Sequence, residues 1–304
     1  MTEGKIWING SVVNWDEATV HVLTHGLHYG TGVFEGIRCY KTVNGSAVFR
    51  LPDHIQRLIE SCKIYFMDIG YSKAQLQKAV IDVIKANKMK ECYVRPIAYY
   101  GYGKMGVNPL PNKVSLAIAA WKWEEYLKGN EGSKTVRLMT SSWMRIDARS
   151  MPVHAKATAN YANSALARVE ALKAGFDEAI MLNTSGMVAE ASAENIFVVK
   201  NNTLITPSLT SGALNGITRD SILDLAKENK IDYQIRNILR DELYTADEVF
   251  LTGTATEVTP VAEIDSRLIG DGKGGIITNQ LKKLFEYVVR GKDKKFSKKW
   301  LTLI

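Results

Sequence analysis

The sequence predicts a two-domain protein of the mixed α/β (α+β) class, and three observations carry this prediction. Hairpin signals precede amphipathic helices in the first half, and strands and helices mix without a regular βαβ rhythm in the second. A polar, glycine-bearing segment, EEYLKGNEGSK, separates the halves. We therefore expect an N-terminal α/β domain over residues 1–123, a linker over 124–134 and a larger C-terminal domain over 135–304.

Local signals predict the elements of the first half. Asn-Gly stands between two pairs of strand-like runs, and this dipeptide favours a tight hairpin turn. The two hairpins span residues 5–13 and 39–49. Apolar residues at helical spacing from Ile55 to Phe66 predict a helix. Ser72 and Gln75 form a capping box that begins a second helix, which carries Leu76, Ala79, Val80, Val83 and Ile84 inward. Two further strands are predicted at 93–100 and 114–121.

The second half combines five strand-like runs with three helical patterns. The strands are VRLMTS, EAIML, NIFVV, TLIT and DEVFLTG. The helices lie at about 160–174, where Gly175 ends the pattern, at 217–229 and at 278–290. No internal repeat is visible, and the irregular order argues against a doubly wound parallel sheet.

Composition bounds the class of protein. The chain has 304 residues, of which 46% are hydrophobic and 23% charged, as in an ordinary globular protein. No apolar run is long enough for a membrane span, and the start has no signal-peptide pattern. Cys39, Cys62 and Cys92 contain no CxxC spacing and are odd in number. They argue against a disulfide framework and predict a cytoplasmic protein.

The net charge of +7 raises the question of nucleic acid. Much of the excess lies in KDKKFSKKW, residues 292–300, which is typical of a solvated terminal face. No helix-turn-helix, zinc finger or aromatic RNA-binding pattern accompanies it. We expect neither a nucleic-acid nor a membrane partner.

One lysine stands in an unusual setting. Lys156 lies in MPVHAKATANYANSALA, a run of small residues just before a predicted helix. Burial lowers the pKa of a lysine, so Lys156 either reaches solvent from a small-residue surface or is kept neutral as a nucleophile.

A glycine-rich stretch, GLHYGTGVFEG at 26–36, and the two histidines near its start suggest either a nucleotide-binding loop or a metal site. Its glycines resemble a nucleotide loop, but the stretch neither follows a predicted strand nor opens a predicted helix. His25 and His28 suggest a metal pair, but no third ligand is spaced with them. We therefore predict a packed turn and no metal.

Three features could together hold a phosphate. NGITR at 215–219 leads into a helix whose first amides are available, although for this stretch alone an ordinary helix cap is the favoured interpretation. The small-residue loop LTGTATE at 251–257 could form an anion nest, or be only a turn. Arg57 falls off the apolar stripe of its helix, which by itself indicates a solvated arginine.

A pair of glutamates completes the set. Glu190 and Glu194 lie in VAEASAENIF at a strand edge, and either could keep a heterocyclic nitrogen protonated. The alternative is a pair of surface glutamates. A deprotonatable lysine, an acid for a ring nitrogen and amide-rich phosphate loops are together what pyridoxal 5'-phosphate requires.

The stretch EASAENIF…LIT…LNGITR (190–219) resembles the signature of class IV aminotransferases, which have fold type IV. Four further stretches resemble the branched-chain amino-acid aminotransferases within that group: HGLHYGTGVFEGIRCY, YVRPIAYYGYGKMGVNP, AKATANYANS and ADEVFLTGTATEVTPV. The resemblance runs from about residue 5 to 290. It implies pyridoxal 5'-phosphate as cofactor, a barrel-like sheet in the C-terminal domain and a homodimer or higher homo-oligomer.

The resemblance also implies roles for individual residues. The family's Schiff-base lysine falls on Lys156. Its other cofactor contacts fall on Arg57, Gly216, Ile217, Thr218 and Thr254 around the phosphate, Glu190 at the pyridine nitrogen and Tyr161 at the phenolic oxygen. The resemblance implies that Tyr93, Thr254 and Ala255 bind the substrate carboxylate. It implies a side-chain pocket lined by Tyr29, Phe34, Val107 and Trp123, and it assigns the distal carboxylate of glutamate to Arg95. Arg38 and Glu194 receive no role.

The implied reaction moves the amino group of L-leucine, L-isoleucine or L-valine to 2-oxoglutarate in a reversible ping-pong cycle. Three enzymes of the same fold are alternatives: a D-amino-acid aminotransferase, an (R)-amine transaminase and an aminodeoxychorismate lyase. GIRCY and the arginine of YVRP favour the branched-chain reaction. A pyridoxal phosphate carrier, or a nucleic-acid binder with a decayed site, is the alternative from another class.

Overall fold

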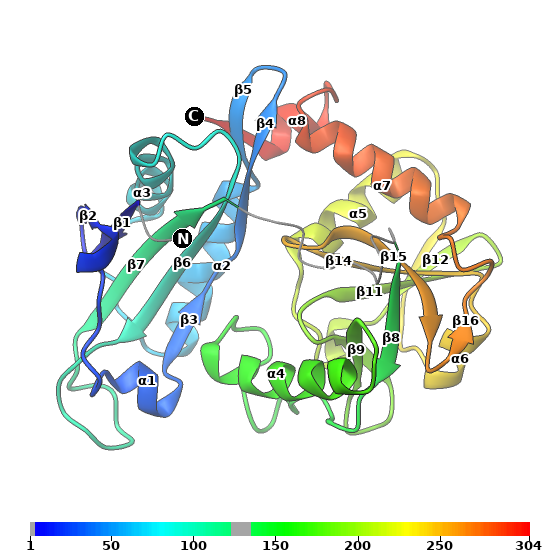
Figure 1. The fold of residues 1–304 in the computed structure, drawn as a ribbon, viewed down its shortest axis with the longest axis horizontal. Coiled ribbons are helices and arrows are strands. Elements are labelled where there is room, and N and C mark those ends of the chain that lie inside the picture. Colours follow the sequence, from blue (N-terminus) through cyan, green and yellow to red (C-terminus); the bar gives the residue numbers. More distant parts are fainter. Residues whose placement is uncertain (1–3, 123–134) are drawn as a thin grey trace. The chain divides into compact units, whose positions relative to one another are not determined.

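The computed structural model describes residues 4–122 and 135–304 (Figure 1). The chain divides into two compact units. Unit 1 takes its residues from Met1–Glu124, Ala155–Ala159 and Val288–Ile304, and unit 2 from Glu125–His154 and Asn160–Tyr287. The expected linker at 124–134 and the expected pocket residue Trp123 lie outside the described residues.

Unit 1 is built on an antiparallel sheet. Across its described residues the strand order is β17-β5-β4-β6-β7-β1-β2, and β3 also pairs with β6. The strands are β1 (Lys5–Ile8), β2 (Ser11–Asn14), β3 (Gly32–Phe34), β4 (Ile37–Thr42), β5 (Gly45–Phe49), β6 (Cys92–Tyr100), β7 (Val114–Trp121) and β17 (Leu301–Leu303). The helices are α1 (His25–Tyr29), α2 (Leu51–Ile64), α3 (Lys73–Ala86) and α8 (Phe296–Trp300), with a 3-10 turn at Trp15–Glu17.

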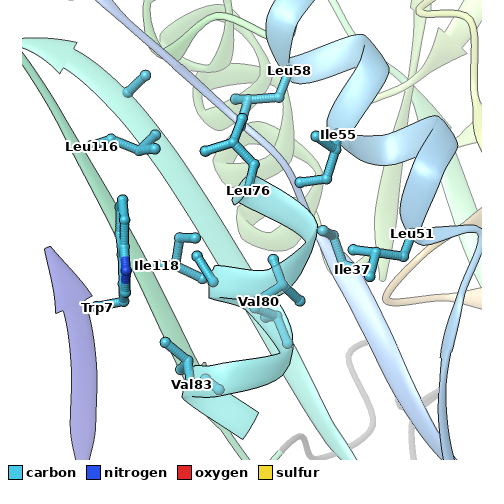
Figure 2. Packing of buried hydrophobic residues seen from close by; sticks show 14 of the residues in the cluster. Trp7, Ile37, Leu51, Ile55, Leu58, Leu76, Val80, Val83, Leu116 and Ile118 are labelled. Carbon is cyan, nitrogen blue, oxygen red and sulfur yellow. The ribbon is translucent and has the colours of Figure 1, made fainter. Parts of the chain in front are cut away.

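The core of unit 1 lies between the sheet and helices α2 and α3. Figure 2 shows Leu51, Ile55 and Leu58 of α2 beside Leu76, Val80 and Val83 of α3, with Trp7, Ile37, Leu116 and Ile118 from the strands. The predicted inward face of α3 is confirmed, because all five residues predicted to point inward are buried. The capping box is confirmed too: Ser72 Oγ accepts from Gln75 N at 3.3 Å, and Gln75 Oε1 accepts from Ser72 N at 2.8 Å.

The inward face predicted from Ile55 to Phe66 is right only in part. Helix α2 ends at Ile64, and Phe66 lies beyond it with φ +55° and its side chain 82% exposed. The chain leaves the helical path there, so the apolar spacing no longer corresponds to one face. Both predicted hairpins are present as β1–β2 and β4–β5. Asn9 and Gly10 have φ values of +48° and +98°, the left-handed conformation that this turn requires.

The glycine-rich stretch at 26–36 forms two short elements where the sequence indicated only a turn. Helix α1 ends at Tyr29, and Gly30 follows it with φ +65°, which a side chain rarely adopts. Strand β3 then pairs with β6. Both elements are too short to give a periodic signal in the sequence.

The basic C-terminal stretch is anchored by its aromatic residues. Phe296 and Trp300 are buried, whereas the lysines between and before them are exposed, as expected of a solvated face. Strand β17 follows and pairs with β5. The pattern at 292–300 is therefore an amphipathic end of unit 1.

Unit 2 contains a mixed sheet. In the part of the chain that is described, its order is β10-β9-β8-β15-β14-β11-β12-β13, with β16 beside β15. Strand β8 runs parallel to β9 and β15, and β12 runs parallel to β13. The strands are β8 (Val136–Thr140), β9 (Glu178–Leu182), β10 (Val188–Ala191), β11 (Asn195–Lys200), β12 (Thr203–Thr206), β13 (Tyr233–Ile235), β14 (Glu248–Gly253), β15 (Glu257–Ile264) and β16 (Arg267–Leu268). The mixed sheet agrees with the predicted class.

The predicted helices of the second half are present. They are α4 (Thr158–Lys173), α5 (Ile217–Glu228) and α7 (Ile276–Val289). Unit 2 also contains a short helix, α6 (Arg240–Tyr244), and a 3-10 turn at Leu209–Ser211. Two of the boundaries between the units fall within α4 and α7. The sheet core includes Ile196 and Leu251, while Phe197 and Phe250 stack with ring centroids 4.9 Å apart. No helix of the described residues combines the length and apolarity needed to cross a membrane.

Candidate functional site

Lys156 belongs to unit 1, where its backbone is fixed from two sides. Phe34 N donates to Lys156 O at 2.9 Å, and Lys156 N donates to Ser61 Oγ of α2 at 3.1 Å. Its neighbours Ala155 and Ala157 are part of the unit 1 core. The small residues that stand out in the sequence therefore pack tightly, and they present the lysine between β3 and α2.

The surroundings of Lys156 favour its neutral form. Burial is the main cause that lowers its pKa from 10.5 to about 8, and the guanidinium of Arg57 adds to the effect, while Glu35 opposes it. Lys156 Nζ lies 5.1 Å from the ring centroid of Phe34. Of the two alternatives for this lysine, the geometry favours the enclosed amine with a lowered pKa over a side chain that reaches solvent.

Arg57 takes part in a buried ion-pair cluster with Glu35 and His54. Arg57 Nε donates to Glu35 Oε1 at 2.6 Å, and its Nη2 donates to Oε2 at 2.9 Å. Glu35 Oε2 also lies 2.8 Å from His54 Nδ1. Burial alone would raise the pKa of Glu35, but the Arg57 guanidinium and His54 outweigh it and hold this pKa well below its usual range.

The simplest expectation for Arg57, a solvated side chain, is therefore wrong. Its side chain is 12% exposed, and that of Glu35 is fully buried. Sequence reasoning missed Glu35 and His54 altogether. One signal was available: His54 and Arg57 stand three residues apart on α2, so they share a face of the helix.

Tyr93 and Arg95 lie on one face of β6, because residues two apart in a strand point to the same side. Arg95 Nη2 donates to Tyr93 Oη at 3.1 Å, and its guanidinium lies 4.7 Å from the ring centroid of Phe34. Arg95 Nε is buried and has no hydrogen-bond partner among the described residues. Tyr93 Oη fills the space that a Cβ on Gly36 would take, so only glycine fits there.

Two of the expected pocket residues lie on the surface of unit 1. Tyr29 is 41% exposed and Val107 is 83% exposed. His25 connects their segments, because its Nε2 lies 2.7 Å from Gly106 O and its ring centroid lies 4.5 Å from that of Tyr29. Arg38 has no predicted role. Its Nη2 lies 3.6 Å from Glu91 Oε1, and its Cζ lies 4.9 Å from the ring centroid of Tyr40.

Glu190 is the centre of a buried polar network in unit 2. Arg145 Nη2 lies 2.9 Å from Glu190 Oε1. Leu214 N and Asn195 Nδ2 donate to Oε2 at 3.0 and 3.2 Å. Both Glu190 and Glu194 are buried, so the alternative of two surface glutamates is wrong. Arg145, which the sequence did not reveal, fixes one carboxylate oxygen of Glu190.

Glu194 has different partners from Glu190. Thr256 Oγ1 donates to its Oε1 at 3.1 Å, and Ala193 N donates to Oε2 at 3.2 Å. Burial raises the pKa of Glu194 despite the opposing charge of Arg168. Thr256 closes the turn between β14 and β15 that contains Thr254 and Ala255, both partly exposed. Glu194 thus holds this turn.

The first turn of α5 lacks a capping side chain. Its N-cap is Gly216, and Ile217 and Thr218 are its first residues. Asn195 Oδ1 occupies the place of a Cβ at Gly216, so this glycine lies directly against a residue that also contacts Glu190. An uncapped helix start with close backbone approach is suited to an anion. Tyr161, partly buried, lies on α4 in the same unit.

The structure therefore assembles the predicted residues in two sets. Unit 1 brings Lys156 close to Arg57, Phe34, Tyr93 and Arg95. Unit 2 brings Glu190 close to the Gly216 turn through Asn195.

Comparison with known proteins decides the family. The family model described as amino-transferase class IV matches residues 32–264. The chain belongs to the class IV aminotransferases. The branched-chain-amino-acid aminotransferase of Pseudomonas aeruginosa is 44% identical over 302 residues, which cover 99% of this chain and 98% of that protein. The enzyme of the same name from Escherichia coli K12 is 44% identical over 281 residues, 92% of this chain and 91% of that one.

Solved structures of class IV aminotransferases agree. A branched-chain amino acid aminotransferase from T.th., complexed with N-(5'-phosphopyridoxyl)-L-glutamate, has a TM-score of 0.94 and 44% identity, and the match covers 100% of this chain and 99% of that one. The same enzyme with pyridoxamine 5'-phosphate also has a TM-score of 0.94, at 45% identity. These similarities confirm the predicted fold class, fold type IV.

Proposed function

We propose that this class IV aminotransferase moves the amino group of L-leucine, L-isoleucine or L-valine to 2-oxoglutarate. The observation that carries the proposal is Lys156, whose pKa is lowered to about 8 beside Arg57 and the ring of Phe34. Relatives that match over nearly the full chain, and are named branched-chain-amino-acid aminotransferases, support the choice of substrate.

The cofactor is pyridoxal 5'-phosphate, and the donor set fits it. The lowered pKa of Lys156 makes its amine available near neutral pH. Glu190 offers a carboxylate that Arg145 holds in place. The start of α5 offers backbone amides that no side chain caps. When bound, the cofactor supplies an electron sink for charge that develops at the substrate Cα.

In this proposal each residue of the chain has a separate task toward the cofactor. Lys156 would hold the cofactor through its Nζ, and the same amine would accept a proton from the substrate Cα. Glu190 keeps the pyridine nitrogen protonated, and Tyr161 donates to the phenolic oxygen. The phosphate is held by Arg57, by the amides of Ile217 and Thr218 after Gly216, and by Thr254.

The substrate is recognised through its two ends. Tyr93, with the amides of Thr254 and Ala255, holds the α-carboxylate. Phe34, Tyr29, Val107 and Trp123 form the apolar wall for a branched side chain. Arg95 holds the distal carboxylate of glutamate, because an apolar pocket rejects an unpaired charge. The buried Nε of Arg95, which has no partner among the described residues, supports this role.

We further propose a cytoplasmic homodimer or higher homo-oligomer, in which residues 124–134 link the domains. The exposed apolar side chains of Leu27 and Leu110 support a contact with a second copy. Three buried, free cysteines agree with a reducing compartment. Sedimentation velocity tests the assembly: a dimer or larger species is expected, and a monomer at micromolar concentration contradicts it.

A donor panel with 2-oxoglutarate as acceptor tests the reaction. L-leucine, L-isoleucine and L-valine are compared with D-alanine and (R)-1-phenylethylamine, and glutamate formation is measured. We expect kcat/KM to be highest for the three branched L-amino acids. Preference for D-alanine or the amine assigns one of the related activities, and absence of turnover with every donor favours a cofactor carrier.

A further inference from the structure

We propose that Glu35 is a positioning residue, anchored by His54, that orients Arg57 for the phosphate of the cofactor. This inference rests on the proposed role of Arg57 as a phosphate ligand. Glu35 is 0% exposed, and Arg57 meets it with two parallel hydrogen bonds through Nε and Nη2. Such a bidentate pair fixes the plane of a guanidinium as well as its position.

Glu35 is itself held rigidly. Its amide donates to Pro96 O at 2.9 Å, and Gly36 N donates to its Oε2 at 3.3 Å. Phe34, the residue before it, binds the backbone of Lys156. One short segment therefore places both the lysine and the carboxylate that aligns the arginine.

His54 fixes the remaining freedom of the carboxylate. A carboxylate can only accept, so the Nδ1 of His54, 2.8 Å from Glu35 Oε2, carries the proton. Burial lowers the pKa of His54 despite the opposing effect of its anionic neighbour Glu35. Glu35 thus receives donors from α2, at His54 and Arg57, and from its own segment.

A view based on charge alone leads to the opposite expectation. Glu35 is an anion, and its removal would strengthen attraction between Arg57 and a phosphate. If alignment dominates, removal weakens phosphate binding, because Arg57 loses the bidentate contact that sets its orientation. The sign of the change therefore separates the two views.

The experiment measures phosphate recognition without turnover and without a covalent bond to Lys156. Apoprotein is titrated calorimetrically with pyridoxine 5'-phosphate and with pyridoxine. The dissociation constant of pyridoxine divided by that of pyridoxine 5'-phosphate reports the contribution of the phosphate. Wild-type protein should prefer the phosphate ester strongly. In Glu35→Gln this preference should fall about tenfold or more while pyridoxine affinity stays constant. Glu60→Gln, the same change at an exposed site of α2, should leave the ratio unchanged.

Two further variants keep the test decisive. In an Arg57→Ala background, Glu35→Gln should have no additional effect on the ratio, because Glu35 acts on the phosphate only through Arg57. His54→Ala should lower the ratio about threefold, and it decides the matter if Glu35→Gln does not fold. An unchanged or increased preference, or equal losses for both ligands, overturns the positioning role. Wild-type protein without preference for the phosphate ester overturns both this inference and the proposed role of Arg57.

Discussion

The lowered pKa of Lys156 leads to a prediction that can be measured on the apoprotein. A shift from 10.5 to about 8 changes how much free amine is present near neutral pH. At pH 7.5 about a quarter of the Lys156 side chains should be deprotonated, against about one in a thousand for an unperturbed lysine. The expected gain in free amine is therefore on the order of two hundredfold.

The assay is the rate of acetylation by limiting acetic anhydride as a function of pH, followed residue by residue by peptide mass spectrometry. The rate at Lys156 should rise with a midpoint near pH 8. Exposed Lys78 on α3 provides an internal reference within the same digest. A midpoint at or above pH 10 for Lys156 would refute the reasoning, because burial and Arg57 would then have no net effect on the amine.

Stability gives a second measurement of the same shift, with a definite sign. The folded pKa lies below the unfolded one, so the unfolded chain binds the extra proton between about pH 8 and pH 10.5. The free energy of unfolding of the wild type should therefore rise, relative to that of Lys156→Met, as pH increases through this window. A difference that stays constant over the window contradicts the shift.

Three further tests use substitutions at Arg57 and Glu35, at the two glutamates of unit 2, and at Arg95. Arg57→Gln removes a positive charge and should raise the pKa of Lys156, whereas Glu35→Gln should lower it; the acetylation profile measures both, and shifts of equal sign contradict the electrostatic account. Glu190→Gln should lower kcat about a hundredfold or more with little change in KM, and greater damage from Glu194→Gln would show that the wrong glutamate was chosen. Arg95→Ala should cost about 2–4 kcal/mol in kcat/KM for glutamate and 2-oxoglutarate and leave the leucine half-reaction almost unchanged in single turnover; equal losses assign Arg95 to the fold.

Local sequence signals predicted much of the fold. The Asn-Gly turns and the Ser72 capping box depend on residues close in the chain, and the structure confirms them. Strand β15 was missed because it begins at Glu257 with φ +55° and contains Pro260, which disfavours a strand assignment. The short strands of unit 1 were missed because three residues give no periodicity.

In the candidate site, too, residues with a local sequence signal were predicted and residues that depend on distant partners were missed. Lys156 stood out because a lone amine among small residues is chemically conspicuous. Tyr93 and Arg95 were indicated only by the family resemblance, and the alternation of a strand accounts for their place on one face. Glu35 and Arg145 gave no such signal, since their importance arises from ion pairs with partners 22 and 45 residues away (57 − 35 and 190 − 145). Tertiary pairing of charges is not encoded in any short stretch.

The most direct test of the central claim is reduction of the holoenzyme with borohydride, followed by tryptic mapping. We predict a phosphopyridoxyl group on the peptide spanning residues 150–168, in which Lys156 is the only lysine. Prior incubation with L-leucine, without an acceptor, should abolish this label, whereas D-alanine should not. A label on another lysine, or a label on Lys156 that D-alanine removes and L-leucine leaves intact, would contradict the account.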